Sequence, residues 1–147
     1  NCARLGIKSV EPLLLDARET GARFSRQADR VLVDAPCSGL GVLRRKPDAR
    51  WRRMPEDLVV LARLQREILQ SAGKAVKPNG ILVYSTCTIE RAENEDVVEE
   101  FLSQNEDFTL ENVGELLPLK KRTEKMLQLY PQRDGTDGFF IARMRRR

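Results

Sequence analysis

Short apolar runs that end in polar turn residues are the main pattern along this chain. Val31, Leu32 and Val33 are consecutive aliphatic residues, and Asp34 follows them directly. A run of this kind with two β-branched side chains predicts a strand that is buried on both faces, as in parallel sheets. Pro36 restricts its own backbone and lacks an amide donor, so the chain is expected to leave the sheet there. Asp34 is therefore expected at the carboxyl end of the strand.

A second apolar run, residues 81–84, repeats this design and leads into the polar sequence Ser-Thr-Cys-Thr at residues 85–88. Between the two runs, residues 55–76 begin with proline and acidic residues and then carry leucines and isoleucine at helical spacing. The three segments predict a β-α-β unit, whose two strands are parallel and end at the same edge of the sheet. Cys37 and Cys87 are therefore expected to face one crevice.

The remaining pattern predicts shorter elements around this unit. Residues 17–29 are polar and are expected to cross back to the strand at Val31. The fold class is α/β, with a mostly parallel sheet that ends in an antiparallel hairpin. The other expected elements are a helix end at residues 1–5, a strand at 10–15 that leads into Asp16, a helix at 93–104 with an acidic outer face, a short strand at 108–110, a loop at 113–122, and a hairpin of strands at 126–130 and 138–144.

The composition is that of a water-soluble globular domain. The chain has 147 residues, of which 41% are hydrophobic and 33% are charged. No apolar run approaches the roughly 18 residues that a membrane span needs, and no secretory signal is visible. The sequence opens at Asn1 in mid-pattern, so we expect it to be part of a longer protein.

Three cysteines without secretory features favour free thiols in a reducing, cytoplasmic setting. No structural zinc site is expected, because the chain lacks histidine and has no CxxC pair. Free cysteines commonly fill cores without reacting. The positions of Cys37 and Cys87 at equivalent strand ends favour catalysis instead, and a redox dithiol is the other alternative. Cys2 lies outside these motifs.

Positive charge is concentrated in one internal segment. The net charge is +4, yet six of the ten residues at positions 44–53 are basic, and four of the last five residues are arginines. Such clusters suit a polyanion such as nucleic acid. Trp51 lies within this segment, where its ring is able to stack on a base. Two simpler alternatives are that Trp51 packs on the domain and that the charges belong to a solvated surface.

Four motifs in order resemble one enzyme family. They are Asp-Ala-Pro-Cys-Ser-Gly at residues 34–39, Gly-Val-Leu-Arg-Arg at 41–45 with Trp51 beyond it, Tyr-Ser-Thr-Cys-Thr at 84–88, and Asp-Gly-Phe-Phe-Ile-Ala-Arg at 137–143. Together they resemble the Sun-type (Nop/Sun family) RNA cytosine-C5 methyltransferases, most closely the bacterial enzymes that modify small-subunit (16S) ribosomal RNA. The resemblance covers nearly the whole chain and implies the later part of a Rossmann-like methyltransferase fold that uses S-adenosylmethionine.

The resemblance also implies roles for individual residues. Cys87 would be the nucleophile that adds to C6 of cytosine, and Cys37 would assist release of the methylated product. Asp34 would contact the cytosine at its protonated N3 or take part in proton removal. Asp16 and Pro36, with Asp34, would contribute to the cofactor site. The residues expected to bind RNA are Arg44, Arg45, Arg50, Trp51 and Arg52.

Two family motifs are missing and would lie before Asn1: the glycine-rich cofactor loop and the acid that holds the ribose hydroxyls. Residues 1–147 are thus expected to form a partial catalytic domain without its first two strands. The strand at residues 10–15 would then lose its place in the sheet, and apolar faces would be uncovered. We expect this piece to self-associate or distort, and not to methylate RNA unaided.

Two other functions fit the same residues. A transfer RNA substrate is the alternative within the same chemistry, because a catalytic core by itself does not read sequence. A non-catalytic RNA-binding module is the alternative from a different class. Loss of the covalent RNA adduct on replacement of Cys87 distinguishes an enzyme from such a module.

Overall fold

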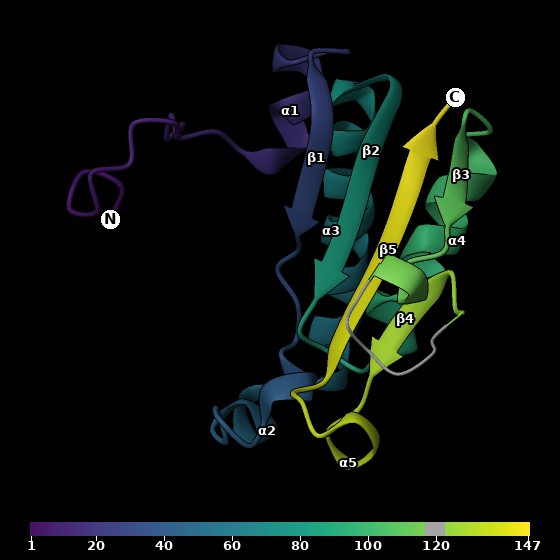
Figure 1. The fold of residues 1–147 in the computed structure, drawn as a ribbon. Helices are drawn as coiled ribbons and strands as arrows, with labels where there is room; N and C mark the ends of the chain where they lie inside the picture. The colour runs from purple at the N-terminus through teal and green to yellow at the C-terminus, as the bar shows by residue number, and fades with distance from the viewer. Residues whose placement is uncertain (117–122) are drawn as a thin grey trace.

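The computed structural model describes residues 1–116 and 123–147, which form a mixed α/β fold around one five-stranded sheet (Figure 1). The strands run in the order β1-β2-β5-β3, and β4 also pairs with β5. The strands are β1 (Ala28–Asp34), β2 (Val76–Thr86), β3 (Phe108–Glu111), β4 (Met126–Leu129) and β5 (Phe139–Arg146). The helices are α1 (Thr20–Arg23), α2 (Ala49–Arg52), α3 (Pro55–Ala75), α4 (Glu95–Gln104) and α5 (Pro131–Asp134).

The predicted β-α-β unit is confirmed. β1 and β2 are parallel, with Asp34 opposite Ser85 in the register, and α3 connects them. Pro55 occupies the first turn of α3, where its missing N–H is harmless, and Asp57 accepts a hydrogen bond of 3.0 Å from the backbone N–H of Met54. The apolar stripe of α3 is buried against the sheet, and its central residue Leu69 is fully buried.

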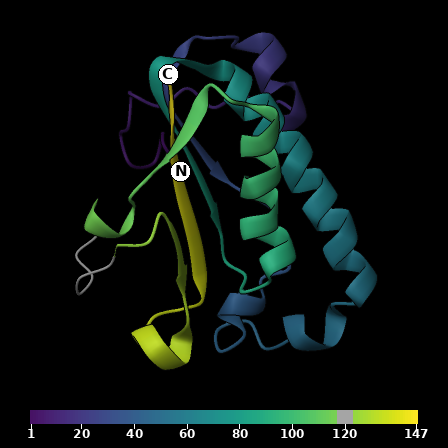
Figure 2. The same ribbon diagram turned by 90° about the vertical axis from the view of Figure 1, so that its right-hand side faces the viewer.

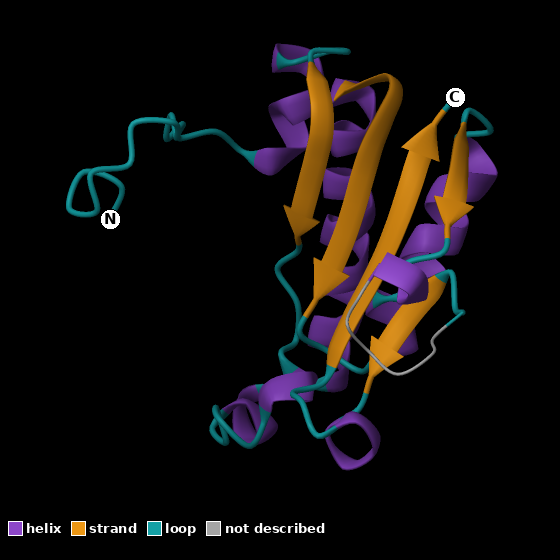
Figure 3. Ribbon diagram, viewed as in Figure 1, coloured by secondary structure: helices purple, strands orange, loops and turns teal. Residues whose placement is uncertain are grey.

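The last strand is the antiparallel centre of the sheet. β5 pairs antiparallel with β2 on one side and with β3 and β4 on the other. The predicted hairpin of the two last strands is therefore confirmed, and the link between them contains the single turn of α5. α3 and α4 lie on the same face of the sheet, where they enclose the main core (Figures 2 and 3).

The segment before β1 differs from the prediction. Residues 10–15 form no strand, and Leu14 is fully exposed. The segment extends away from the sheet (Figure 1) and pairs with no strand in the described chain. Without a neighbouring strand its backbone groups have no ladder to join. Residues 1–5 form only one turn, closed by a hydrogen bond of 3.0 Å from Leu5 N–H to the carbonyl of Asn1.

The prediction that β1 is buried on both faces is wrong. Val33 points to the core and is buried, but Leu32 on the other face is 68% exposed. β1 pairs only with β2 among the described strands and is thus an edge strand. A run of aliphatic residues shows that both faces of a strand are apolar enough to be buried. In the described chain, nothing packs on the face of β1 that carries Leu32.

The connecting segments are compact where they are described. A 3₁₀ turn at Ala17–Glu19 and the short helix α1 make the crossing predicted for residues 17–29. Of the loop predicted at residues 113–122, Gly114–Leu116 is a 3₁₀ turn and residues 117–122 lie outside the described residues. Within the described chain, no helix is long and apolar enough to cross a membrane.

Candidate active site

The two cysteines after β1 and β2 lie side by side, as predicted. Their Sγ atoms are 3.4 Å apart, within hydrogen-bonding distance, and both residues are partly buried. This proximity follows from the fold, because parallel neighbouring strands end at the same edge of the sheet. Cys2, in contrast, is on the N-terminal segment.

The electrostatic environment of Cys37 keeps its thiol protonated. The pKa of Cys37 is raised to about 12. Burial is the larger cause, and the neighbouring Cys87 sulfur is the smaller one. The protonated form of Cys37 is therefore the stable one at neutral pH. It is able to donate a hydrogen bond to Cys87 across the 3.4 Å that separates the sulfur atoms.

Asp34 ends β1 close to the thiols. It is exposed, and its Oδ1 accepts a hydrogen bond of 3.2 Å from the hydroxyl of Ser85 on β2. The next backbone N–H, that of Ala35, donates to the carbonyl of Ser85 at 2.9 Å, which ties the strand ends together. A carboxylate beside a pair of thiols can accept a proton or a hydrogen bond from a bound ligand.

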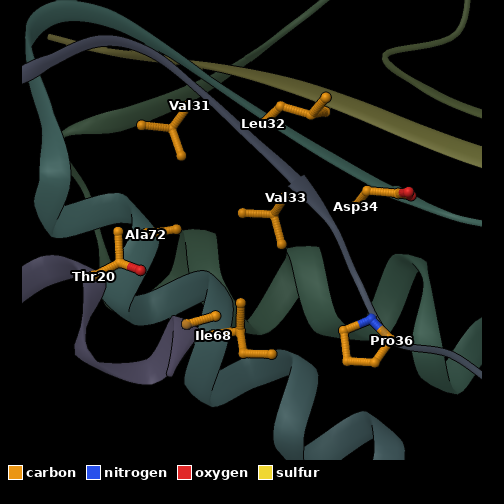
Figure 4. Close-up of a pocket in the computed structure, with 9 residues that line it drawn as sticks. Thr20, Val31, Leu32, Val33, Asp34, Pro36, Ile68 and Ala72 are labelled. Atoms are coloured by element: carbon orange, nitrogen blue, oxygen red, sulfur yellow. The ribbon is translucent and has the colours of Figure 1, made fainter. Parts of the chain in front are cut away.

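A pocket of about 190 Å³ lies between β1 and the helices α1 and α3 (Figure 4). Asp34 and Pro36 line it at the carboxyl end of β1, and Thr20 of α1 and Ile68 of α3 line it from the helices. Its polar end, with one carboxylate, suits the polar part of a small ligand. Most ligand sites enclose about 300 Å³ or more, so these residues fit part of a nucleoside cofactor rather than all of it.

The sequence-predicted cofactor residue Asp16 lies next to this pocket but does not line it. Its carboxylate caps the 3₁₀ turn by accepting from the backbone N–H of Arg18, and it also pairs with the guanidinium of Arg18 at 2.6 Å. These bonds lower the pKa of Asp16 to about 2. Asp16 is therefore held by Arg18, and in the chain it directly precedes Ala17, which lines the pocket.

A buried carboxylate that the sequence analysis did not single out lies beneath the cysteine loops. Glu93, expected at the start of a helix with an acidic outer face, is fully buried. It accepts hydrogen bonds from the backbone N–H and the hydroxyl of Ser38. Glu93 ends the 3₁₀ turn Arg91–Glu93, before α4 begins at Glu95, so no helical spacing in the sequence marked it as buried.

Other polar groups fix the loop that carries Cys37. The side-chain amide of Gln65 on α3 donates to the carbonyl of Pro36 at 2.8 Å. The guanidinium of Arg53 donates to the carbonyl of Ser38 at 3.0 Å. The N–H of Gly41 donates to the carbonyl of Cys87 at 3.0 Å. The two cysteine loops are therefore bound to each other as well as to α3.

The basic segment forms the rim next to these loops. Arg44 and Arg45 each pair with Asp137 at 2.7 Å, which fastens the segment to the start of β5. Trp51 is 80% exposed, and the guanidinium of Arg50 lies 5.5 Å from the centre of its ring. The alternative that Trp51 packs on the domain is therefore wrong. Arg52 is likewise exposed on α2.

Comparison with known proteins identifies the same family that the motifs resemble. A family model described as "16S rRNA methyltransferase RsmB/F" matches residues 1–145. The chain is 44% identical to the "Probable ribosomal RNA small subunit methyltransferase B" of Bacillus subtilis (strain 168), over 98% of this chain and 33% of that protein. It is 40% identical to the "Ribosomal RNA small subunit methyltransferase F" of Serratia proteamaculans (strain 568), over 99% of this chain and 31% of that protein.

A solved structure has the same fold. NSun6 from Pyrococcus horikoshii, crystallised with SFG, superposes with a TM-score of 0.83 and 34% identity, over 99% of this chain and 36% of that one. The chain thus spans about a third of the length of the curated relatives it matches. With a family match over nearly all of its length and the paired thiols at the strand ends, this chain belongs to the RsmB/F family of 16S rRNA methyltransferases, within the Sun-type enzymes.

Proposed function

We propose that this chain carries the cytosine chemistry of an RNA cytosine-C5 methyltransferase that acts on small-subunit ribosomal RNA in the cytoplasm. The observation that carries the proposal is the 3.4 Å separation of the Cys37 and Cys87 sulfur atoms beside Asp34. The names of the relatives, which are ribosomal RNA methyltransferases, support the substrate class.

Cys87 is the proposed nucleophile. C5 of cytosine is a weak nucleophile, and addition of the Cys87 thiolate to C6 moves electron density onto C5. Bound S-adenosylmethionine would supply the methyl group that C5 takes, with S-adenosylhomocysteine as the leaving group. Asp34 accepts a hydrogen bond from the protonated N3 of the adduct. The C5 proton then passes to the Asp34 carboxylate or to water, its bonding pair re-forms the C5–C6 double bond, and the C6–S bond breaks, which releases 5-methylcytosine and the Cys87 thiolate.

Cys37 acts at the release step. Its thiol stays protonated because burial raises its pKa to about 12. It therefore donates a hydrogen bond to the Cys87 sulfur as that sulfur regains its negative charge. Cys87 thus forms the covalent bond to C6, and Cys37 assists when that bond breaks.

The cofactor and RNA contacts follow from the positions around the thiols. Asp34 and Pro36 line the pocket, and Asp16 directly precedes the lining residue Ala17, so this edge is the proposed cofactor side. SFG, an analogue of S-adenosylmethionine, in the related NSun6 structure supports this choice of cofactor. The proposed RNA contacts form the rim beside the loops: Arg44, Arg45, Arg50, Trp51 and Arg52.

We also propose that copies of the isolated chain associate through β1. This strand is an edge strand with an exposed leucine, Leu32, and an unpaired edge recruits further strands. The pairing satisfies backbone groups that are otherwise left to water.

The decisive experiment places this chain in the Bacillus subtilis relative, in exchange for the 149 residues that it matches. The chimera is incubated with S-adenosylmethionine and RNA that contains 5-fluorocytosine, whose C5 substituent cannot leave as a proton. A covalent protein–RNA complex should form, and Cys87→Ala should abolish it. With ordinary RNA, Cys37→Ala should instead accumulate the complex, because product release is blocked.

The control is Cys2→Ala, which removes a thiol outside the site and should leave complex formation and methylation unchanged. Full methylation activity in the Cys87→Ala chimera would overturn the assignment of the nucleophile. A chimera that binds RNA but forms no adduct would support the binding-module alternative.

A further inference from the structure

Glu93 is a fully buried carboxylate that the proposed mechanism does not use. It is the last residue of the 3₁₀ turn Arg91–Glu93, which precedes α4, and it makes no ion pair within the described residues. Burying a carboxylate is costly unless hydrogen bonds replace the lost water. The groups that donate hydrogen bonds to Glu93 are therefore the groups whose positions it fixes.

Three donors converge on this carboxylate. The backbone N–H of Ser38 and the side-chain amide of Gln65 each donate to Oε1 at 2.9 Å. The hydroxyl of Ser38 donates to Oε2. Two of the three bonds thus come from Ser38, the residue that directly follows Cys37, so Glu93 grips the Cys37 loop at two points.

The same hydrogen bonds reach the second cysteine loop. The Ser38 hydroxyl has one proton, and that proton goes to Glu93. The bond of 2.8 Å between the Ser38 and Thr88 hydroxyls is therefore donated by Thr88. Thr88 directly follows Cys87. One directed chain, Thr88 to Ser38 to Glu93, thus connects the residues next to the two thiols.

We propose that Glu93 is a positioning residue that sets the separation of the Cys37 and Cys87 sulfur atoms through this hydrogen-bonded chain. Glu93 touches neither thiol, so it acts only through Ser38 and Thr88. Its effect on catalysis rests on the proposed function, but its effect on the distance between the thiols does not. The two effects are therefore measured separately.

The first test measures thiol proximity in this 147-residue chain with Cys2→Ser, which leaves only the two site cysteines. Oxidised glutathione takes two electrons from the thiol pair, which yields the Cys37–Cys87 disulfide and two glutathione thiols. The equilibrium constant of this exchange gives the effective concentration of the Cys37 thiol at the Cys87 thiol. Glu93→Gln places an amide donor where Ser38 now donates, and should lower this value by about tenfold or more.

Two further variants keep the test interpretable. Glu99→Gln neutralises an exposed carboxylate on α4 that pairs with Arg91, and it should leave the effective concentration unchanged. Ser38→Ala removes the hydroxyl but keeps the backbone donor, so it should fold even where Glu93→Gln does not. Ser38→Ala should also lower the effective concentration. An unchanged value in folded Glu93→Gln or Ser38→Ala protein would overturn the proposal.

The second test measures methylation by the chimera. A misplaced thiol affects the chemical step, so Glu93→Gln should lower kcat by about 10²-fold, while KM for RNA stays within about twofold. Because Glu93 and Ser38 act in one chain, the double variant should lose no more activity than Glu93→Gln alone. Additive losses would overturn the proposal. An inactive unsubstituted chimera, together with the expected change in thiol proximity, would support the positioning role and contradict the proposed function.

Discussion

Cys37 differs chemically from an ordinary cysteine because the fold holds it partly buried against a second sulfur atom. Its pKa is raised from 9.0 to about 12, with burial as the larger cause. The folded chain therefore binds this proton more tightly than the unfolded chain does. This difference in pKa contributes to the free energy of unfolding. The contribution is fully present below pH 9 and is lost as the pH rises toward 12.

The raised pKa predicts slow alkylation of Cys37. The thiolate is the reactive form, so the rate with iodoacetamide should rise by about tenfold for each pH unit between 7.5 and 10 without levelling off. Peptide mass spectrometry after timed quenching measures this rate. The same chain in urea is the control, and there the rate should level off near the ordinary pKa of 9.0. A plateau near that value in the folded chain would contradict the assigned environment.

Residue patterns predicted the thiol pair but not its support. Cys37 and Cys87 follow two runs that are recognisable as parallel strands, and parallel topology alone brings strand ends together. Glu93 accepts hydrogen bonds from Ser38 and Gln65, and Ser38 in turn bonds Thr88, so the network joins three separate segments. A local pattern cannot show that such groups converge.

At the scale of elements, β1 shows how a strand depends on its neighbours. Its register with β2 is continuous from Arg30 to Asp34, yet its outer edge and the face that carries Leu32 are uncovered by any described strand. The pattern predicted where the strand lies because Val31–Val33 has high β-propensity. It could not predict exposure, and residues 10–15 failed to form a strand for the related reason that no partner strand adjoins them.

The uncovered strand predicts concentration-dependent association of the isolated chain. Leu32→Lys should shift it toward the monomer in sedimentation experiments, because a charged side chain discourages edge pairing. The free energy of unfolding should change by less than about 0.5 kcal/mol, since the side chain is mostly in water.

Val59→Lys is the matched control, because Val59 is 72% exposed and belongs to α3 rather than to the edge strand β1. This control should associate as the unsubstituted chain does. An unsubstituted chain that stays monomeric at about 100 μM, within the micromolar to millimolar range in which exposed strand edges drive association, would contradict the expectation.

At the scale of the whole molecule, we propose that the chain holds the thiol site together with only part of the cofactor site. The sulfur atoms, Asp34 and their supporting bonds all come from the described residues. The pocket beside them has about 190 Å³, and the relatives are about three times as long as this chain. The family resemblance predicted this division, because residues 1–147 contain no counterpart of the family's glycine-rich cofactor motif.

This division predicts that the isolated chain does not methylate RNA, whereas the chimera does. Both proteins receive S-adenosylmethionine with a labelled methyl group, and label in the RNA is counted. RNA binding by the isolated chain should remain and should weaken as salt rises, because arginines contact phosphates. Methyl transfer by the isolated chain at the rate of the chimera would contradict the prediction.

The contact between Gly41 and Gly138 has a consequence for synthesis of the protein. The N–H of Gly138 donates to the carbonyl of Gly41 at 2.8 Å, and Asp137 beside it binds Arg44 and Arg45. The arginine-rich rim is thus fastened by residues made almost a hundred positions later. During translation these arginines therefore stay unfastened until Asp137 and β5 have emerged from the ribosome.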